Sequence, residues 1–156
     1  MSPVDPYDRL RPSTDIEECE CEVVTHLLLI IGWMSENPIS CGECRREVDP
    51  ERLRLTTKEV DLVAGWNVVS NSLYWLWLDS GEYEEYAKAR LSDPTSQINT
   101  DGMKVAEMLS ARLPTRLWYY SDTDDGTLIE CPVCARPLDT NVKWGTGDCP
   151  VCKIRM

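Results

Sequence analysis

Apolar positions recur at helical spacing through the middle of the chain. Thr56 and Glu59 stand three residues apart, as the partners of a capping box do, and predict that a helix begins there. Ser80 and Gly81 are a natural helix end, so this helix is expected to run to about residue 80. One face of it carries apolar residues at helical spacing, namely Leu62, Trp66, Val69, Leu73 and Trp77.

Two shorter helices are predicted to follow. The first contains Tyr83, Tyr86, Ala87 and Arg90 and ends before Asp93-Pro94, because a residue that precedes proline avoids the helical conformation. The second spans about 96–112 and stops at Pro114. Its apolar face consists of Ile98, Gly102, Val105, Ala106 and Leu109.

Extended segments are predicted on both sides of the helices. Residues 23–31 are rich in Val, Leu and Ile and indicate a buried strand that ends at Gly32. Asn37-Pro38 marks a turn. Residues 115–120 alternate as a strand does, 121–126 form an acidic turn, and 127–130 form a short strand.

The cysteines near the C-terminus predict a metal site. Cys131-Pro132-Val133-Cys134 recurs as Cys149-Pro150-Val151-Cys152, with fourteen residues between the two copies. Two such turns can place four thiolates tetrahedrally around one zinc ion, as in a zinc ribbon. A redox pair of the thioredoxin type is the alternative, but it needs a βαβ setting that this segment does not offer.

A second metal site is predicted nearer the N-terminus. Cys41 and Cys44 form another Cys-x-x-Cys turn, and Cys19 and Cys21 are spaced to point the same way from a strand. These four could bind a second zinc. His26 could replace one of them, although it is expected as a hydrogen-bonded residue of the sheet, and Cys19 could instead be a free thiol.

The fold class expected from these elements is α+β, in three parts. Residues 1–14 contain three prolines and few apolar residues, and predict a flexible tail. Residues 15–130 form the body, with an N-terminal β element that carries a Cys-x-x-Cys knuckle and a helical middle. Residues 131–156 form a C-terminal Cys₄ zinc ribbon.

Composition and charge narrow the classes of function. The 156 residues include 27 acidic and 16 basic side chains, and the formal charge of −11 opposes capture of nucleic acid or an anionic membrane. The longest uncharged apolar run, 27–34, has eight residues, whereas a transmembrane helix needs roughly 20. Residues 1–5 lack the basic start and apolar stretch of a secretory signal, so a cytoplasmic protein is expected.

The acidic segments are candidate contacts for a basic protein partner. One segment carries Glu17, Glu18 and Glu20, and the turn at 121–126 carries Asp124 and Asp125. Trp75 and Trp77 cannot face the same side of a helix, so one of them is expected at the surface, and we take Trp75 as a candidate interface anchor. The alternatives are an ordinary solvated edge for the acids and a core position for the Trp.

The order of these pieces resembles a bacterial family of zinc-ribbon-containing proteins of uncharacterised function. The resemblance rests on residues 21–27, 37–44 and 114–120, on a Trp-containing helix, and on the two C-terminal Cys-x-x-Cys turns. It covers the chain from about residue 19, but over 62–112 only the helical character and the Trp are shared. It implies a bacterial, cytosolic, zinc-binding protein, and the family's provisional label is nucleic-acid binding.

The function expected is binding rather than catalysis. The chain has one histidine, and no His-Glu-x-x-His or Gly-rich phosphate loop, so neither an enzyme nor a small-molecule substrate is expected. We expect a zinc-binding protein that binds a basic protein, as an immunity protein or inhibitor of a toxin nuclease does. The alternative is a nucleic-acid-binding or regulatory zinc ribbon, because residues 131–156 carry +2 while the rest carries −13.

Overall fold

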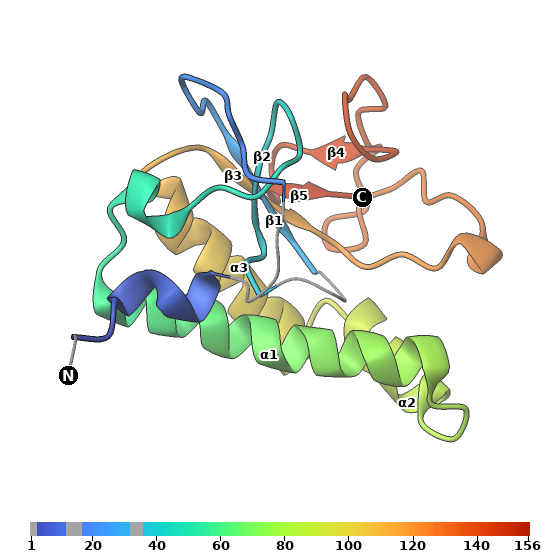
Figure 1. The fold of residues 1–156 in the computed structure, drawn as a ribbon. Helices are drawn as coiled ribbons and strands as arrows, with labels where there is room; N and C mark the ends of the chain where they lie inside the picture. Colours follow the sequence, from blue (N-terminus) through green and yellow to red (C-terminus); the bar gives the residue numbers. More distant parts are fainter. Residues whose placement is uncertain (1–2, 12–16, 32–35) are drawn as a thin grey trace.

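The computed structural model describes residues 3–11, 17–31 and 36–156. One five-stranded sheet lies above three α-helices in the view of Figure 1, which confirms the α+β class. The strand order is β2-β1-β3-β5-β4. The strands are β1 (Leu27–Ile30), β2 (Ile39–Cys41), β3 (Thr115–Trp118), β4 (Asp148–Cys149) and β5 (Ile154–Arg155).

The sheet mixes parallel and antiparallel pairs. β1 is antiparallel to β2 and parallel to β3, and the connection from β2 to β3 contains all three helices. β3 then pairs in parallel with β5, with Leu117 opposite Ile154. Parallel strands need a long crossover, and the helical middle of the chain supplies it between β1 and β3.

The C-terminal ribbon shares this sheet with the body, and the sheet continues across the expected boundary at residue 131. β5 joins the body through β3, and β4 joins β5 at the edge. Ile154 is fully buried because its side chain takes part in the core of the body. A ribbon cut away at residue 131 would expose this side chain and lose its pairing with β3.

The helices agree with the predicted ranges. They are α1 (Thr57–Asp79), α2 (Glu84–Ser92) and α3 (Gln97–Ser110), and α1 begins with the predicted capping box between Thr56 and Glu59. The predicted apolar face of α3 is buried throughout. Trp66 of α1 is buried against α3, where its indole Nε1–H donates to the Ile98 carbonyl at 2.9 Å. Among the described residues, no helix combines the length and the apolar character that crossing a membrane requires.

The predicted apolar face of α1 is only partly in the core. Leu62 and Val69 are each 51% exposed, although Trp66 between them is buried. The two side chains lie along a groove between α1 and α3 that neither helix fills. Helical spacing identified a shared face correctly, but it could not show what covers that face.

Two predicted strands differ from the structure. The strand expected over 23–31 begins only at Leu27, because its ladder partner β3 begins after Pro114, and its expected end at Gly32 lies outside the described residues. The strand expected over 127–130 is absent: Glu130 forms a single bridge to Pro137, and Leu128 and Ile129 are exposed. Residues 136–138 lie beside this segment, with the Leu138 N–H donating to the Ile129 carbonyl at 2.9 Å, but Pro137 has no N–H to extend the pairing, so a single bridge forms instead of a strand.

The expected flexible tail over 1–14 contains a packed element. A 3-10 helix, η1 (Pro6–Leu10), lies against α1, and Leu10 is fully buried. The guanidinium of Arg11 ties this segment to residues 49–51, at 3.1 Å from the Asp49 carboxylate and 2.9 Å from the Glu51 carboxylate. Pro6 starts the helix here instead of preventing one, since proline is tolerated in a first helical turn.

Candidate metal centres

The eight cysteines form two groups of four. The Sγ atoms of each group all lie within 4.8 Å of one another. The first group is Cys19, Cys21, Cys41 and Cys44, and the second is Cys131, Cys134, Cys149 and Cys152. The fold therefore brings Cys19 and Cys21 together with the first knuckle, as predicted, and His26 is not in that group.

Three Cys-x-x-Cys turns share one backbone geometry. In the first two, the backbone N–H of the leading cysteine donates to the backbone carbonyl of the residue five positions later. Cys41 donates to the Arg46 carbonyl and Cys131 to the Arg136 carbonyl, both at 2.8 Å. In the third, Cys149 pairs with Ile154 across β4 and β5 at the same spacing. The residue after each trailing cysteine has a left-handed backbone, with φ of 61° at Arg45, 62° at Ala135 and 57° at Lys153.

The Cys19-Cys21 segment has no turn of its own and is held from a distance. The Cys19 N–H donates to the Glu47 carbonyl at 2.8 Å. The Arg52 guanidinium donates to the carbonyls of Cys19 and Cys21, at 3.0 Å and 2.6 Å. Arg52 thereby orients two of the four thiols of the first group. Cysteine spacing gives no hint of it, because the contact spans more than thirty residues of sequence.

His26 lies beside the first knuckle and packs on it. Its imidazole Nδ1 is 2.9 Å from the Thr25 hydroxyl, and its carbonyl accepts the Gly42 N–H at 2.9 Å. The ring lies where a side chain at position 42 would be. His26 thus has the hydrogen-bonded role that was expected of it, although it lies just before β1 and not within the sheet.

The second group is tied to the body by a buried carboxylate. Asp148 precedes Cys149 and is 8% exposed. Its Oδ1 accepts from Nε of Arg116 on β3 at 3.0 Å and from Nε of Arg155 on β5 at 3.1 Å. A carboxylate shared by two guanidinium groups fixes β4 and β5 relative to β3, and so fixes the third turn relative to the sheet.

The sulfur geometry fits a tetrahedral metal ion. A Zn–S distance near 2.3 Å puts the corners of a tetrahedron about 3.8 Å apart. The Sγ atoms of Cys134 and Cys149 are 3.7 Å apart. Backbone N–H groups of Val133 and Cys152 donate to the sulfurs of Cys131 and Cys149, both at 3.4 Å, which favours the thiolate form. Both groups are compatible with zinc.

The thiols differ in how readily they ionise. The backbone N–H of Arg136 is the main cause that lowers the pKa of Cys134 to about 7. Burial opposes ionisation of Cys19, yet the Cys21 N–H and the neighbouring thiols lower its pKa to about 7. The hydrogen bond with Cys19 raises the pKa of Cys21 to about 12, and burial chiefly raises that of Cys152 to about 12. A metal ion that binds must therefore displace protons from the thiols with the higher pKa.

The two groups are joined through the first knuckle and the loop before β4. The indole N–H of Trp144 donates to the Glu43 carbonyl at 3.2 Å, and Lys143 Nζ is 3.1 Å from the Glu43 carboxylate. The Arg45 guanidinium lies 4.9 Å from the ring centroid of Trp118 and 5.8 Å from that of Trp144. The left-handed Arg45 thus supplies a cation–π contact between the two centres.

The candidate partner contacts lie in two separate places. Glu17, Glu18 and Glu20 are exposed beside the first group, and Glu17 is 3.7 Å from Arg46. Asp124 and Asp125 lie in η3 (Thr123–Asp125), beside α2 and away from the blue N-terminal segment in Figure 1. Trp75 is 44% exposed, whereas Trp77 packs edge-on against Tyr120.

The fold and the two centres define an α+β protein with two Cys₄ groups on a shared sheet. Comparison with protein-family models, with curated proteins and with solved structures finds no match. The resemblance to a zinc-ribbon family therefore stays a prediction from the sequence.

Proposed function

We propose that this is a non-enzymatic zinc protein of the cytoplasm that binds a basic protein, as an immunity protein or inhibitor of a toxin nuclease does. Each Cys₄ group would hold one zinc. Four thiolates fill the coordination shell and leave no position for water or substrate, which suits a structural ion. Eight thiols that must stay reduced to hold metal fit a reducing compartment.

An acidic hollow at the end of α1 is the observation that carries the partner proposal. The hollow has a volume of about 380 Å³. Its charged lining has four carboxylates and one amine, contributed by Glu84, Glu85, Asp122, Asp124 and Lys88. The one amine is already neutralised, because Lys88 Nζ is 2.9 Å from Asp122 and 2.8 Å from Asp125.

Apolar side chains border the same hollow. Trp77 and Leu78 line it, and Leu78 is 44% exposed. Trp75 lies three residues before Leu78, a spacing that places both on one side of the helix. A lysine or arginine of a partner could put its charge among the carboxylates and its aliphatic stem on this apolar edge.

The test is affinity capture at low salt with the zinc-loaded protein, with and without nuclease. We expect the wild type to capture a basic protein in stoichiometric amount, with or without nuclease. The double variant Glu85→Lys/Asp124→Lys should no longer capture it. The matched control, Glu18→Lys/Glu20→Lys, makes the same charge change beside the first metal group. If only this control variant abolishes capture, the contact lies at the N-terminal acidic segment. If neither variant reduces capture, the charge-based proposal is wrong.

A nucleic-acid function has one observation in its favour. Arg45 and Lys143 lie over the rings of Trp118 and Trp144, and basic groups next to aromatic faces are typical of single-strand binding. Glu43 offsets Lys143, and the chain as a whole is acidic. Recovery of nucleic acid in the capture, lost at higher salt and in Arg45→Ala, would favour this function over protein binding.

A further inference from the structure

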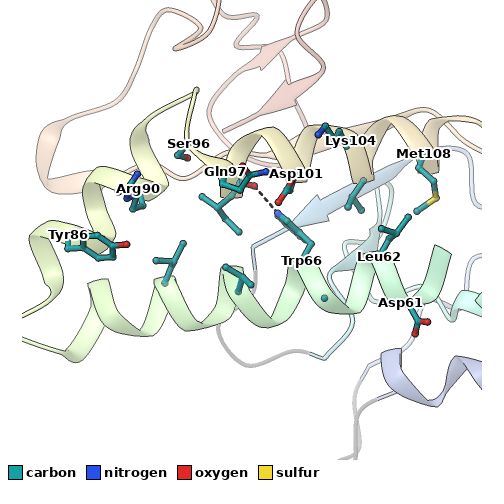
Figure 2. Close-up of a pocket in the computed structure, with 15 residues that line it drawn as sticks. Asp61, Leu62, Trp66, Tyr86, Arg90, Ser96, Gln97, Asp101, Lys104 and Met108 are labelled. Carbon is teal, nitrogen blue, oxygen red and sulfur yellow. Dashed lines mark hydrogen bonds between the residues drawn. The ribbon is translucent and has the colours of Figure 1, made fainter. Parts of the chain in front are cut away.

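The side of α1 that faces α3 carries apolar side chains that the described residues leave half exposed. Leu62 and Val69 are each 51% exposed and, with Leu73, line a groove of about 650 Å³. Val105 and Met108 of α3 form the opposite wall, and Figure 2 shows the two helices antiparallel, with Trp66 between them. A half-exposed apolar strip of this length is unusual for a surface that faces only water.

The spacing along α1 is that of a helix-pairing seam. Apolar residues fall at intervals of four, three, four and three, at Leu62, Trp66, Val69, Leu73 and Leu76. This is the a/d pattern through which two helices interdigitate. Trp66 uses its position to pack on α3, and Leu73 and Leu76 are partly buried. Leu62 and Val69 are left half exposed, so the seam keeps apolar surface for another helix.

We infer that the occupant is α1 of a second copy of this chain, antiparallel, with a two-fold axis at Val69. This register brings Leu62 against Leu76 of the other copy and Leu73 against Gly65. The space for Leu73 exists, because a Cβ at Gly65 would meet no atom within 4 Å. Large residues thus face large ones at both ends of the seam, and Leu73 faces the glycine.

The charges along the groove also suit an antiparallel pair. Its lining has two acids and two bases, Asp61, Asp101, Arg90 and Lys104, so the groove adds no net charge where two copies of a chain of charge −11 would meet. Lys58 lies in the first turn of α1 and Asp79 ends the helix, and the two-fold axis brings Lys58 of one copy near Asp79 of the other. Asp61 and Arg90 likewise lie at opposite ends of the groove.

Sedimentation equilibrium of the zinc-loaded chain tests the pairing. Wild type is expected as a dimer in reversible equilibrium with monomer. Val69→Glu puts two carboxylates together at the axis and is expected to weaken dimerisation at least about tenfold. The matched control is Val68→Glu, one residue away on the same helix and 62% exposed, which is expected to leave the dimer intact.

A charge exchange tests the register. Lys58→Glu and Asp79→Lys each place like charges together across the axis and should each weaken the dimer, while the double variant should restore it. Both changes suit the helix dipole, so the monomer should fold normally. A wild type that stays monomeric at high concentration overturns the inference, as does a dimer unaffected by Val69→Glu or one that Val68→Glu disrupts instead. A monomer whose partner capture is lost in Val69→Glu would assign the groove to that partner.

Discussion

The imidazole of His26 lies so close to Gly42 that a Cβ at position 42 would be 1.9 Å from its Cδ2 atom. Gly42 is the first residue between Cys41 and Cys44, so the ring packs directly on a metal-binding turn. The lone histidine of the chain therefore supports the first centre by packing and not as a ligand.

Gly42→Ala should destabilise the first centre. Either the ring or the turn must move, which costs about 1–3 kcal/mol of folding free energy, as over-packing does. Thermal melting and zinc retention against a chelator measure the effect. Gly65→Ala is the control, measured on the dilute monomer: the added methyl enters open space in a helix, so stability should rise by up to about 1 kcal/mol with zinc retention unchanged.

Arg52→Ala should loosen the same centre from the other side. The variant leaves the carbonyls of Cys19 and Cys21 without their donor, and a lost supporting contact of this kind lowers metal affinity by about 10–100-fold. Competition with a chelator should show that the zinc ion of the first group is released more easily than in wild type. Release from the second group should be unchanged. Equal weakening of both ions, or of neither, would contradict the assigned role of Arg52.

The effect of a substitution at Ala135 on stability should depend on how well the new residue tolerates a left-handed backbone. Its φ of 62° lies in the left-handed region, where a Cβ is unfavourable. Ala135→Gly should raise the free energy of unfolding by up to about 1 kcal/mol, and Ala135→Val should lower it, because a β-branched side chain tolerates this region least. Denaturant unfolding of the zinc-loaded protein measures these differences. A valine variant more stable than the glycine variant would refute the shared turn geometry.

Glu59 should contribute stability that depends on pH. Burial acts to raise the pKa of Glu59, but hydrogen bonds from Arg112 and Thr56 outweigh it and hold the pKa below the usual 4.5. A lowered carboxyl pKa gives stability that is present above 4.5 and lost as the pH falls through the folded value.

Glu59→Gln keeps the shape and removes the charge that faces Arg112, 2.5 Å away at the Nη1 atom. Near neutral pH the variant should unfold about 1 kcal/mol more easily than wild type, and the difference should shrink below about pH 4. Denaturant unfolding at several pH values measures it, with the exposed Glu107→Gln as control. A difference that is constant with pH would mean that the carboxylate charge plays no part.

Local signals in the sequence predicted the elements that local chemistry determines. The capping box at Thr56 and Glu59 predicted the start of α1, and Pro114 predicted that α3 ends before it, as it does at Ser110. Cysteine spacing predicted the second Cys₄ group and the Cys41/Cys44 half of the first, because a Cys-x-x-Cys turn directs its two sulfurs together whatever surrounds it. Cys19 and Cys21 form no such turn, and their place in the first group was one of several alternatives until the structure showed it.

Long-range pairing could not be predicted in the same way. The partnership of β5 with β3 joins Ile154 to Leu117, and nothing in either segment specifies the other. The strand predicted at 127–130 had a suitable composition, but the segment beside it contains Pro137, and the pairing stops at one bridge. Leu62 and Val69 have the spacing of core residues, and only the packed structure shows that α3 leaves them half exposed.

The most direct measurement is the zinc content of the purified chain together with its melting temperature before and after chelation. We expect two zinc ions per chain, one in Cys19→Ser and one in Cys131→Ser, and a large drop in melting temperature when the metal is removed. A chain that holds no zinc, or that melts unchanged without it, would contradict two structural zinc centres on one sheet.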